Sequence, residues 1–436
     1  MSVGKVGAVT TSRRVYYGWV LVVTLALTET ISWGVLYYAF TVFLRPMQDE
    51  LGWSRGAMTG AFSLALLLSG LAAIPAGRWL DRHGPRLLMT AGSVSATVLV
   101  LAWAGVRDLW SFYLIWAAIG VTMAAVLYEP AFVVVAKWFV RHRGRALTVL
   151  TFIAGFASVI YIPLAERLVT ALGWRQALVV LALMLATGTI LPHALVLRHR
   201  PQDLGLLPDG GTGETSPASN PARSRIRHFV PTRLVLRSAA FWWLTAAFCL
   251  NAVGVLAVNV HLVPYLIDRG HTPAFAANMS GLIGVMALPG RLVLTPLGDR
   301  LPRSAVTASL FLSQTVALAV LVLWRGTAGV LAFVVLFGAG FGAITPARAA
   351  LVAEYYGPDA FGSINGVVAL FVTAARAVGP VGVGAVYDRI GSYTPLWWAL
   401  AVVSVLSAGA ILMAEIRAPR PAWDASTGAS GAGTTR

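Results

Sequence analysis

The sequence predicts an all-α membrane protein in which twelve transmembrane helices form two pseudo-symmetric six-helix halves. Hydrophobic residues make up 58% of the 436 residues and charged residues only 11%, whereas about 25% charged residues is usual in a soluble domain. Twelve apolar runs reach the length of about 20 residues that a helix needs to cross a bilayer. They are too long and too uniformly apolar for the strands of a membrane barrel. In addition, short motifs recur half a chain length apart.

The twelve apolar runs are bounded by charges, glycines and prolines. We expect spans near residues 17–44, 54–80, 86–106, 109–136, 145–170, 174–197, 238–266, 273–298, 303–324, 328–351, 361–387 and 393–415. The first run follows two arginines, as in a signal peptide. It is longer than the apolar region of a signal peptide and lacks a small-residue cleavage site. We therefore interpret it as the first helix.

The net charge of +16 is explained by membrane topology. If the N-terminus is cytoplasmic, 23 of the 33 Lys and Arg residues lie in cytoplasmic segments, 8 in the opposite loops and 2 inside the bilayer. This positive-inside bias predicts a multi-pass protein of the inner (plasma) membrane with both termini in the cytoplasm. Anionic lipid headgroups are natural partners for the basic loops. No surface for nucleic acid remains once the loops are assigned.

One long polar segment divides the chain. Residues 198–237 are rich in Gly, Pro and Ser and predict a flexible cytoplasmic linker. It separates an N-terminal six-helix half, residues 1–197, from a C-terminal half, residues 238–416. Residues 417–436 predict a disordered cytoplasmic tail.

An internal repeat supports the division into halves. The motif "GWS" follows the first span and "GHTP" the seventh, while "LDRHGPR" follows the second span and "GDRLPR" the eighth. The members of each pair lie 218 residues apart. In the fourth and tenth spans, Pro130 and Pro346 correspond at an interval of 216 residues. Duplicated six-helix halves are typical of transporters that rock around a site near the bilayer midplane.

The segment after the second span carries a recognisable signature. It resembles the G-x-x-x-D-R-x-G-R-R motif of the major facilitator superfamily, and with the repeat the resemblance covers nearly the whole chain. The resemblance implies a conformational latch formed by Gly77, Asp81, Arg82, Gly84 and Arg86. Gly77 would allow close helix approach, and Asp81 could bond the N-terminus of a neighbouring helix. Alternatively, the charges serve only as cytoplasmic anchors. In the second copy Thr295 replaces the glycine, which predicts a weaker latch there.

Several shorter motifs resemble the monocarboxylate and oxalate-formate carrier branch of that superfamily. They are, in chain order, "YYGWVLV", "GWSRG", "LYEPAF", "RPQDLGLLPDG", "HLVPYL", "AARAVGP" and "YDRIGSY". Each motif is only moderately specific, and their order along the chain adds weight. The resemblance implies secondary transport of small organic anions.

Two arginines lie well inside the expected spans, Arg291 in the eighth and Arg376 in the eleventh. Charges at this depth must pair, bind a ligand or face a water-filled cavity. A guanidinium group offers a planar fork of donors that matches a carboxylate, so we expect an anionic substrate. Oxalate carriers hold their dianion with basic residues at positions that these two arginines match. Alternatively, each arginine forms a structural ion pair.

Two glutamates in the N-terminal half are candidates for proton coupling, Glu29 and Glu129. A buried carboxyl group can carry a proton through a transport cycle, and Pro130 allows a bend beside Glu129. The alternative for either glutamate is a fixed salt bridge to an arginine. Animal monocarboxylate carriers have an Asp and a Lys where this sequence has Ala287 and Tyr38. Proton coupling must therefore use Glu29 or Glu129, or it is absent and anion exchange or uniport replaces it.

Polar and aromatic residues complete the expected binding cavity. Tyr37, Tyr128 and Asn259 are candidate substrate contacts, and Trp33 lies on the same helical face as Tyr37 because the two are four residues apart. His261 could titrate near neutral pH, or it could be a hydrogen-bonded structural residue.

Enzymatic chemistry finds no support in the sequence. No catalytic residues, cofactor motif or metal-ligand spacing is present, and no phosphate-binding loop follows a strand. We expect a monomeric secondary active transporter that carries small organic anions, monocarboxylates first among them, by proton symport or anion exchange. The alternative is a proton-coupled drug or metabolite efflux pump, although the fifth span lacks the Gly-Pro motif of drug antiporters. A sensor without transport activity is disfavoured because no signalling domain is appended.

Overall fold

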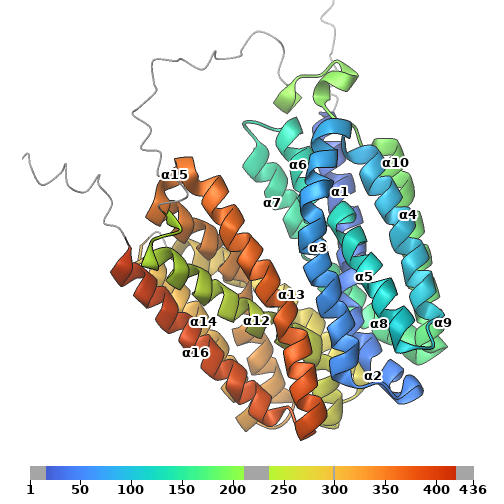
Figure 1. The fold of residues 1–436 in the computed structure, drawn as a ribbon, viewed down its shortest axis with the longest axis vertical. Coiled ribbons are helices and arrows are strands. Elements are labelled where there is room, and N and C mark those ends of the chain that lie inside the picture. The colour runs from blue at the N-terminus through green and yellow to red at the C-terminus, as the bar shows by residue number, and fades with distance from the viewer. Residues whose placement is uncertain (1–15, 211–234, 298–299, 419–436) are drawn as a thin grey trace, which may run out of the picture.

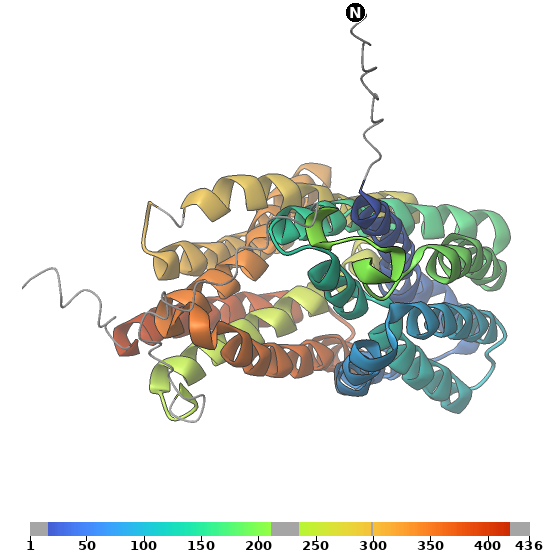
Figure 2. The same ribbon diagram turned by 90° about the horizontal axis from the view of Figure 1, so that it is seen from above.

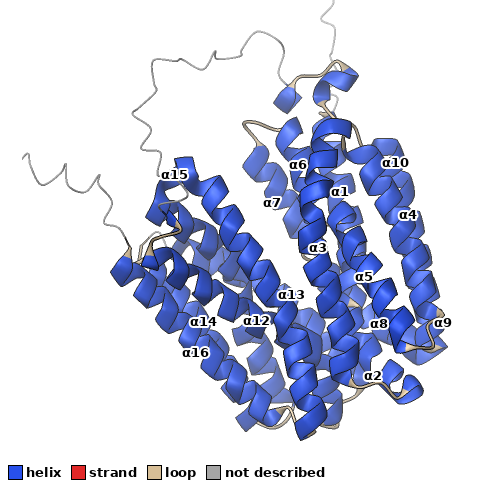
Figure 3. Cartoon of the chain, viewed as in Figure 1, coloured by secondary structure: helices blue, strands red, loops and turns tan. Residues whose placement is uncertain are grey.

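The computed structural model describes residues 16–210, 235–297 and 300–418, and this part of the chain is helical without strands (Figure 3). The N-terminal half contains α1 (Tyr17–Trp33), η1 (Gly34–Tyr38), α2 (Phe40–Leu51), α3 (Arg55–His83), α4 (Pro85–Ala104), α5 (Leu109–Val126), α6 (Tyr128–Trp138), α7 (Arg143–Ala154), α8 (Ala157–Leu172), α9 (Trp174–Leu185), η2 (Ala186–Ile190) and α10 (Leu191–Val196). Two short helices follow, η3 (Pro201–Leu204) and η4 (Pro208–Gly210).

The C-terminal half contains α12 (Ala239–Asp268), α13 (Pro273–Leu297), α14 (Arg303–Leu323), α15 (Thr327–Ile390) and α16 (Thr394–Arg417). The element α15 includes both the tenth and the eleventh expected spans, as Thr327–Tyr356 and Ile364–Ile390. The sequence predicted two separate helices here, whereas the helical backbone continues between them.

The two halves form separate bundles that lie side by side (Figures 1 and 2). They diverge toward the end that carries η3 and η4, which we call the linker side, and meet at the opposite end, the far side (Figure 1). Eleven helices in the described residues are long and apolar enough to cross a membrane, and α13 occupies the place of the expected eighth span. The predicted fold class is therefore confirmed.

The fourth span is broken next to a proline. Helix α5 ends at Val126, Leu127 is extended, and α6 begins at Tyr128. Pro130 cannot donate to the carbonyl group of Val126, and its ring would clash with that group. The break places Glu129 in the first turn of α6.

The first span contains a five-residue π-helix, η1. A side chain at Gly34 would clash with the ring of Tyr161 in α8, so only glycine allows this approach. The wider helical turn changes the register of the following residues, and such turns are frequent at functional sites. Here the turn brings the neighbouring Tyr37 and Tyr38 to the same cavity.

Small residues bring the two halves together on the far side. Gly384 of α15 lies against Gly56 of α3, and a side chain on either would overlap the opposite helix. A side chain at Gly284 of α13 would clash with Ser158 of α8. Close backbone approach of this kind stabilises helix pairs inside a membrane.

The start of the linker is anchored on the N-terminal half. The carboxylate of Asp209 accepts hydrogen bonds from the backbone amides of Val140, Arg141 and His142, at 3.0, 2.7 and 3.1 Å. Tyr16 adds a hydrogen bond from its hydroxyl group to the carbonyl oxygen of Leu207, at 3.1 Å. Partial burial opposes ionisation of Asp209, but the three amide donors outweigh it and hold the pKa of Asp209 below its ordinary value.

We expect Asp209→Ala to loosen the loop between α6 and α7. Losing one acceptor for three amides costs about 1–2 kcal/mol, so amide hydrogen exchange at residues 140–142 should rise about tenfold. Because the folded pKa is lowered, the protection is complete at neutral pH and is lost as pH falls through that pKa. The control is Asp203→Ala, which affects only the turn at Arg200. If amide hydrogen exchange at residues 140–142 is unchanged in Asp209→Ala, Asp209 does not anchor the loop between α6 and α7.

Candidate functional site

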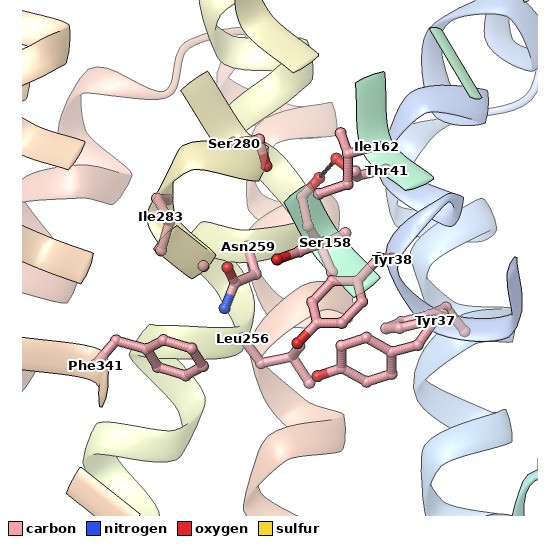
Figure 4. Close-up of a pocket in the computed structure, with 13 residues that line it drawn as sticks. Tyr37, Tyr38, Thr41, Ser158, Ile162, Leu256, Asn259, Ser280, Ile283 and Phe341 are labelled. Carbon is pink, nitrogen blue, oxygen red and sulfur yellow. Dashed lines mark hydrogen bonds between the residues drawn. The ribbon is translucent and has the colours of Figure 1, made fainter. Parts of the chain in front are cut away.

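A small, partly open cavity lies between the two halves (Figure 4). We call it the central cavity; its lining residues are Tyr37, Tyr38, Thr41, Phe62, Ser158, Ile162, Leu256, Asn259, Val260, Ser280, Ile283, Gly284 and Phe341. Both tyrosines point from η1 toward the C-terminal half (Figure 4). The hydroxyl group of Ser280 has no hydrogen-bond partner among the described residues. The wall of the central cavity is largely apolar with a few polar groups, as in most small-molecule sites.

Aromatic rings cover the N-terminal side of the central cavity. The ring of Trp33 lies 5.0 Å from that of Tyr37 and 5.0 Å from that of Tyr128, and Tyr37 lies 5.1 Å from Tyr38, between ring centroids. The expected shared face of Trp33 and Tyr37 is confirmed. Tyr128 belongs to this cluster and stacks on Phe132, although it does not line the central cavity itself.

Arg376 lies in the second span of α15 and faces the N-terminal half. Its charge acts on Tyr37, Tyr38 and Glu129, all of which belong to that half. The side chain is exposed, and it forms no ion pair with a described carboxylate. It is not among the lining residues of the central cavity. An exposed guanidinium group without an ion pair is free to receive an anion.

The two glutamates of the N-terminal half differ in their surroundings. Glu129 is exposed and lies within electrostatic reach of Arg376. Glu29 is fully buried in α1, within hydrogen-bonding reach of the side chain of Trp33. The two carboxyl groups are close enough to influence each other. Neither takes part in a salt bridge of the described residues.

Of the two remaining candidate residues, Asn259 lines the central cavity and His261 does not. Asn259 lines the central cavity, and its amide nitrogen donates to the carbonyl oxygen of Val255 at 3.0 Å. His261 is fully buried away from it. Its Nδ1 is 2.9 Å from the hydroxyl group of Tyr393, and its Nε2 is 2.9 Å from the carbonyl oxygen of Pro380. With both ring nitrogens engaged, His261 has the geometry of the structural alternative.

Some expected residues fall outside what the structure describes. The backbone of Arg291 belongs to α13 and that of Asp81 to α3, but both side chains lie outside the described part. Within the latch, Arg82 and Arg86 are exposed, and nothing lies within 4 Å of a side chain built on Gly77. Gly84 adopts φ +81 next to His199. Gly77 therefore does not mediate a close helix contact in this conformation.

A network of charged residues closes the far side of the molecule. Arg55 is 1% exposed and makes two hydrogen bonds to Asp268, at 2.6 and 3.0 Å. It also donates to the hydroxyl group of Tyr393 at 3.0 Å, and its guanidinium carbon lies 4.4 Å from the ring centroid of Tyr387. We call Arg55, Asp268, Tyr387, Asp388 and Tyr393 the far-side gate.

Asp388 attaches α15 to the beginning of α3. Its two carboxylate oxygens accept from the backbone amides of Arg55 and Gly56, at 3.0 and 2.8 Å. A carboxylate is stabilised at the N-terminus of a helix by free amide groups and by the helix dipole. The sequence DRIG at residues 388–391 has the same spacing as DRHG at residues 81–84. Asp388 thus makes on the far side the contact that the sequence predicted for Asp81 on the linker side.

Sequence reasoning missed the far-side gate, and it omitted Ser158 and Ser280 from the cavity. The motifs "GWSRG" and "YDRIGSY" contain Arg55, Tyr387, Asp388 and Tyr393. These two motifs resemble known motifs, but the resemblance assigned no function to the residues in them. The repeated D-R-x-G spacing could have shown that Asp388 corresponds to Asp81.

Comparisons with known proteins agree with this geometry. The sequence model of the Major Facilitator Superfamily matches residues 22–380. Monocarboxylate transporter 13 of Bos taurus is 25% identical over 408 residues, which cover 91% of this chain and 87% of that protein. The uncharacterized MFS-type transporter YcxA of Bacillus subtilis is 24% identical over 367 residues, covering 81% and 85%.

Solved transporter structures share the fold. A bacterial homologue of the human lysosomal transporter Spinster, in an inward-facing and occupied conformation, superposes with a TM-score of 0.70 at 16% identity, covering 94% of this chain and all of that one. The nucleoside transporter NupG gives a TM-score of 0.71 at 13% identity, with 91% and 99% covered. At these identities the likeness concerns the fold alone.

Proposed function

Because this chain belongs to the major facilitator superfamily and is a transporter rather than an enzyme, we propose that it carries small organic anions by alternating access. Arg376 carries the proposal, since it is an exposed guanidinium group within electrostatic reach of the aromatic side of the site. It matches a carboxylate in shape and charge. Similarity to monocarboxylate transporters supports monocarboxylates as one substrate class.

The arrangement of the halves supports a conformation open toward the linker side. The hydrogen bonds of the far-side gate join α3 to α12, α15 and the loop before α16. We propose that the linker side is cytoplasmic, because most of the positive charge lies there. Closure of that side by the latch, with opening of the far-side gate, would then expose Arg376 to the opposite compartment.

Uptake into proteoliposomes tests the proposed function. Purified protein should take up at least one labelled acid from formate, lactate, pyruvate, oxalate and succinate with saturable kinetics. The same vesicles should not take up tetraphenylphosphonium, because the cationic Arg376 disfavours it. Uptake of the cation with no uptake of any acid would favour the efflux alternative.

We propose that Glu129 and Glu29 carry the proton if transport is proton-coupled. Glu129 is exposed and within electrostatic reach of Arg376, and Glu29 is buried within electrostatic reach of Glu129. Carboxyl groups in such pairs form proton relays in transporters. The glutamates belong to the half opposite Arg376, so protonation and anion binding can influence each other across the site.

We expect Glu129→Gln to uncouple transport from the proton gradient. The amide preserves the shape of the side chain but cannot take up a proton, so an inward proton gradient should no longer stimulate uptake. Exchange of internal for external substrate should continue, because Arg376 is intact. The control is Glu354→Gln, an exposed residue that pairs with Arg303. Gradient-driven uptake at the wild-type rate in Glu129→Gln would remove Glu129 from the proton path.

A further inference from the structure

Besides Arg291 and Arg376, the C-terminal half contains a third arginine within a membrane span, near the end of the tenth span. We propose that Arg348 is a second anion-binding residue beside Arg376, and that the preferred substrate carries two carboxylate groups. The proposal rests on the proposed function, because it extends the same site from one anionic group to two. In the proposed complex, each guanidinium group binds one carboxylate group of the substrate.

Arg348 and Arg376 belong to the same helical element, α15. The two residues lie on the two spans of α15, Arg348 in Thr327–Tyr356 and Arg376 in Ile364–Ile390. The positive charge of each is within electrostatic reach of the other. Arg348 is half-buried, and its Nε is buried without a hydrogen-bond partner among the described residues.

No described carboxylate neutralises this pair of charges. The ion pairs of the described residues do not include Arg348 or Arg376. Glu129 acts on Arg376, whereas the neighbour of Arg348 is the thiol group of Cys249. Two like charges with an unmet buried donor are costly inside a protein. A bound anion with two acceptor groups would remove both the repulsion and the unmet donor.

The internal repeat makes the site chemically asymmetric. The interval of 216 residues that relates Pro130 to Pro346 relates Phe132 to Arg348. In the N-terminal half, Phe132 stacks on Tyr128 with a centroid distance of 5.1 Å. The corresponding position in the C-terminal half carries a guanidinium group. Corresponding positions are therefore aromatic in one half and cationic in the other.

Transport of acids matched in carbon number tests the proposal. Succinate and butyrate each contain four carbons and differ by one carboxylate, as do malonate and propionate. In Arg348→Gln, the apparent affinity for the dicarboxylates should fall by about tenfold or more, because a charged hydrogen-bonded pair is lost. The affinity for the monocarboxylates should change by less than about threefold. Arg376→Gln should lose affinity for both dicarboxylates and monocarboxylates.

The outcomes separate this inference from the proposed function. If the wild type takes up no carboxylate, the proposed function fails. If the wild type takes up carboxylates but Arg348→Gln loses both classes equally, or neither, the inference fails while the proposed function stands. Arg348→Lys keeps the charge without the planar fork and should recover part of the preference for dicarboxylates.

Cys249 provides a readout that does not depend on transport. It is the only cysteine of the chain, and it lies within electrostatic reach of Arg348. Succinate should slow its alkylation by a small maleimide in purified wild type and in Arg389→Gln, and it should fail to do so in Arg348→Gln. Each variant is first checked for a monodisperse elution profile. Equal protection by succinate in Arg348→Gln would overturn the proposal.

Discussion

Arg376→Gln should abolish carboxylate uptake in proteoliposomes while leaving the protein folded. Glutamine keeps hydrogen-bonding groups at this position but removes the charge and the bidentate fork. Hydrogen bonds to a charged group contribute about 1.5–3 kcal/mol. Because about 1.4 kcal/mol corresponds to a tenfold change in affinity, binding should weaken by at least about tenfold. Equilibrium binding of a labelled acid to the purified protein measures this loss.

The matched control for this substitution lies on the same helix. Arg389 is exposed near the far-side end of α15, and unlike Arg376 it does not act electrostatically on Tyr37, Tyr38 or Glu129. Arg389→Gln removes the same charge from the same element and should bind the acid as the wild type does. If Arg376→Gln binds as tightly as Arg389→Gln, Arg376 is not the anion anchor.

Arg55→Gln should shift the conformational equilibrium toward a state with the far side open. Arg55 is buried with Asp268 and Tyr393 in the far-side gate. Asp268 keeps its ion pair with Arg45 in this variant, so the loss is that of the charged hydrogen bonds of Arg55, about 1.5–3 kcal/mol, and only the closed conformation bears it. A change of this size moves a two-state equilibrium by about tenfold to a hundredfold.

Spin-label distances on both ends of the molecule measure the shift. In a Cys249→Ser background, labels at Arg107 and Arg325 report the far side, and labels at Leu87 and Leu301 report the linker side; all four residues are exposed. Arg55→Gln should lengthen the first distance and shorten the second. The control is Arg175→Gln, which breaks an ion pair to Glu50 within the N-terminal half. Equal distance distributions in the two variants would show that Arg55 does not hold the gate closed.

The fold could be predicted from local features of the sequence. Span lengths, the linker and the repeat require only composition and spacing. Even the break before Glu129 was foreseeable, because Pro130 cannot complete a helical hydrogen bond to Val126. The π-helix at residues 34–38 was not foreseeable, since it depends on Gly34 meeting Tyr161 in another helix.

The site was foreseeable only where a charge lies deep in a span. Arg376 and Glu129 stand out for this reason. Arg348 lies three residues from the expected end of the tenth span, so it was indistinguishable from a cytoplasmic anchor. Arg55, Asp268 and Asp388 belong to loops or helix ends that are far apart in the chain. Their pairing exists only once the two halves are closed on the far side.

In the proposed mechanism, the site recognises the charge of a carboxylate. Competition between an acid and its neutral amide tests it most directly, because lactate and lactamide differ little in size but only lactate can pair with Arg376. With the labelled acid that the wild type transports best, we predict displacement by unlabelled acids and none by the amide at the same concentration. Equal displacement by acid and amide, or stronger displacement by a lipophilic cation, would contradict the account.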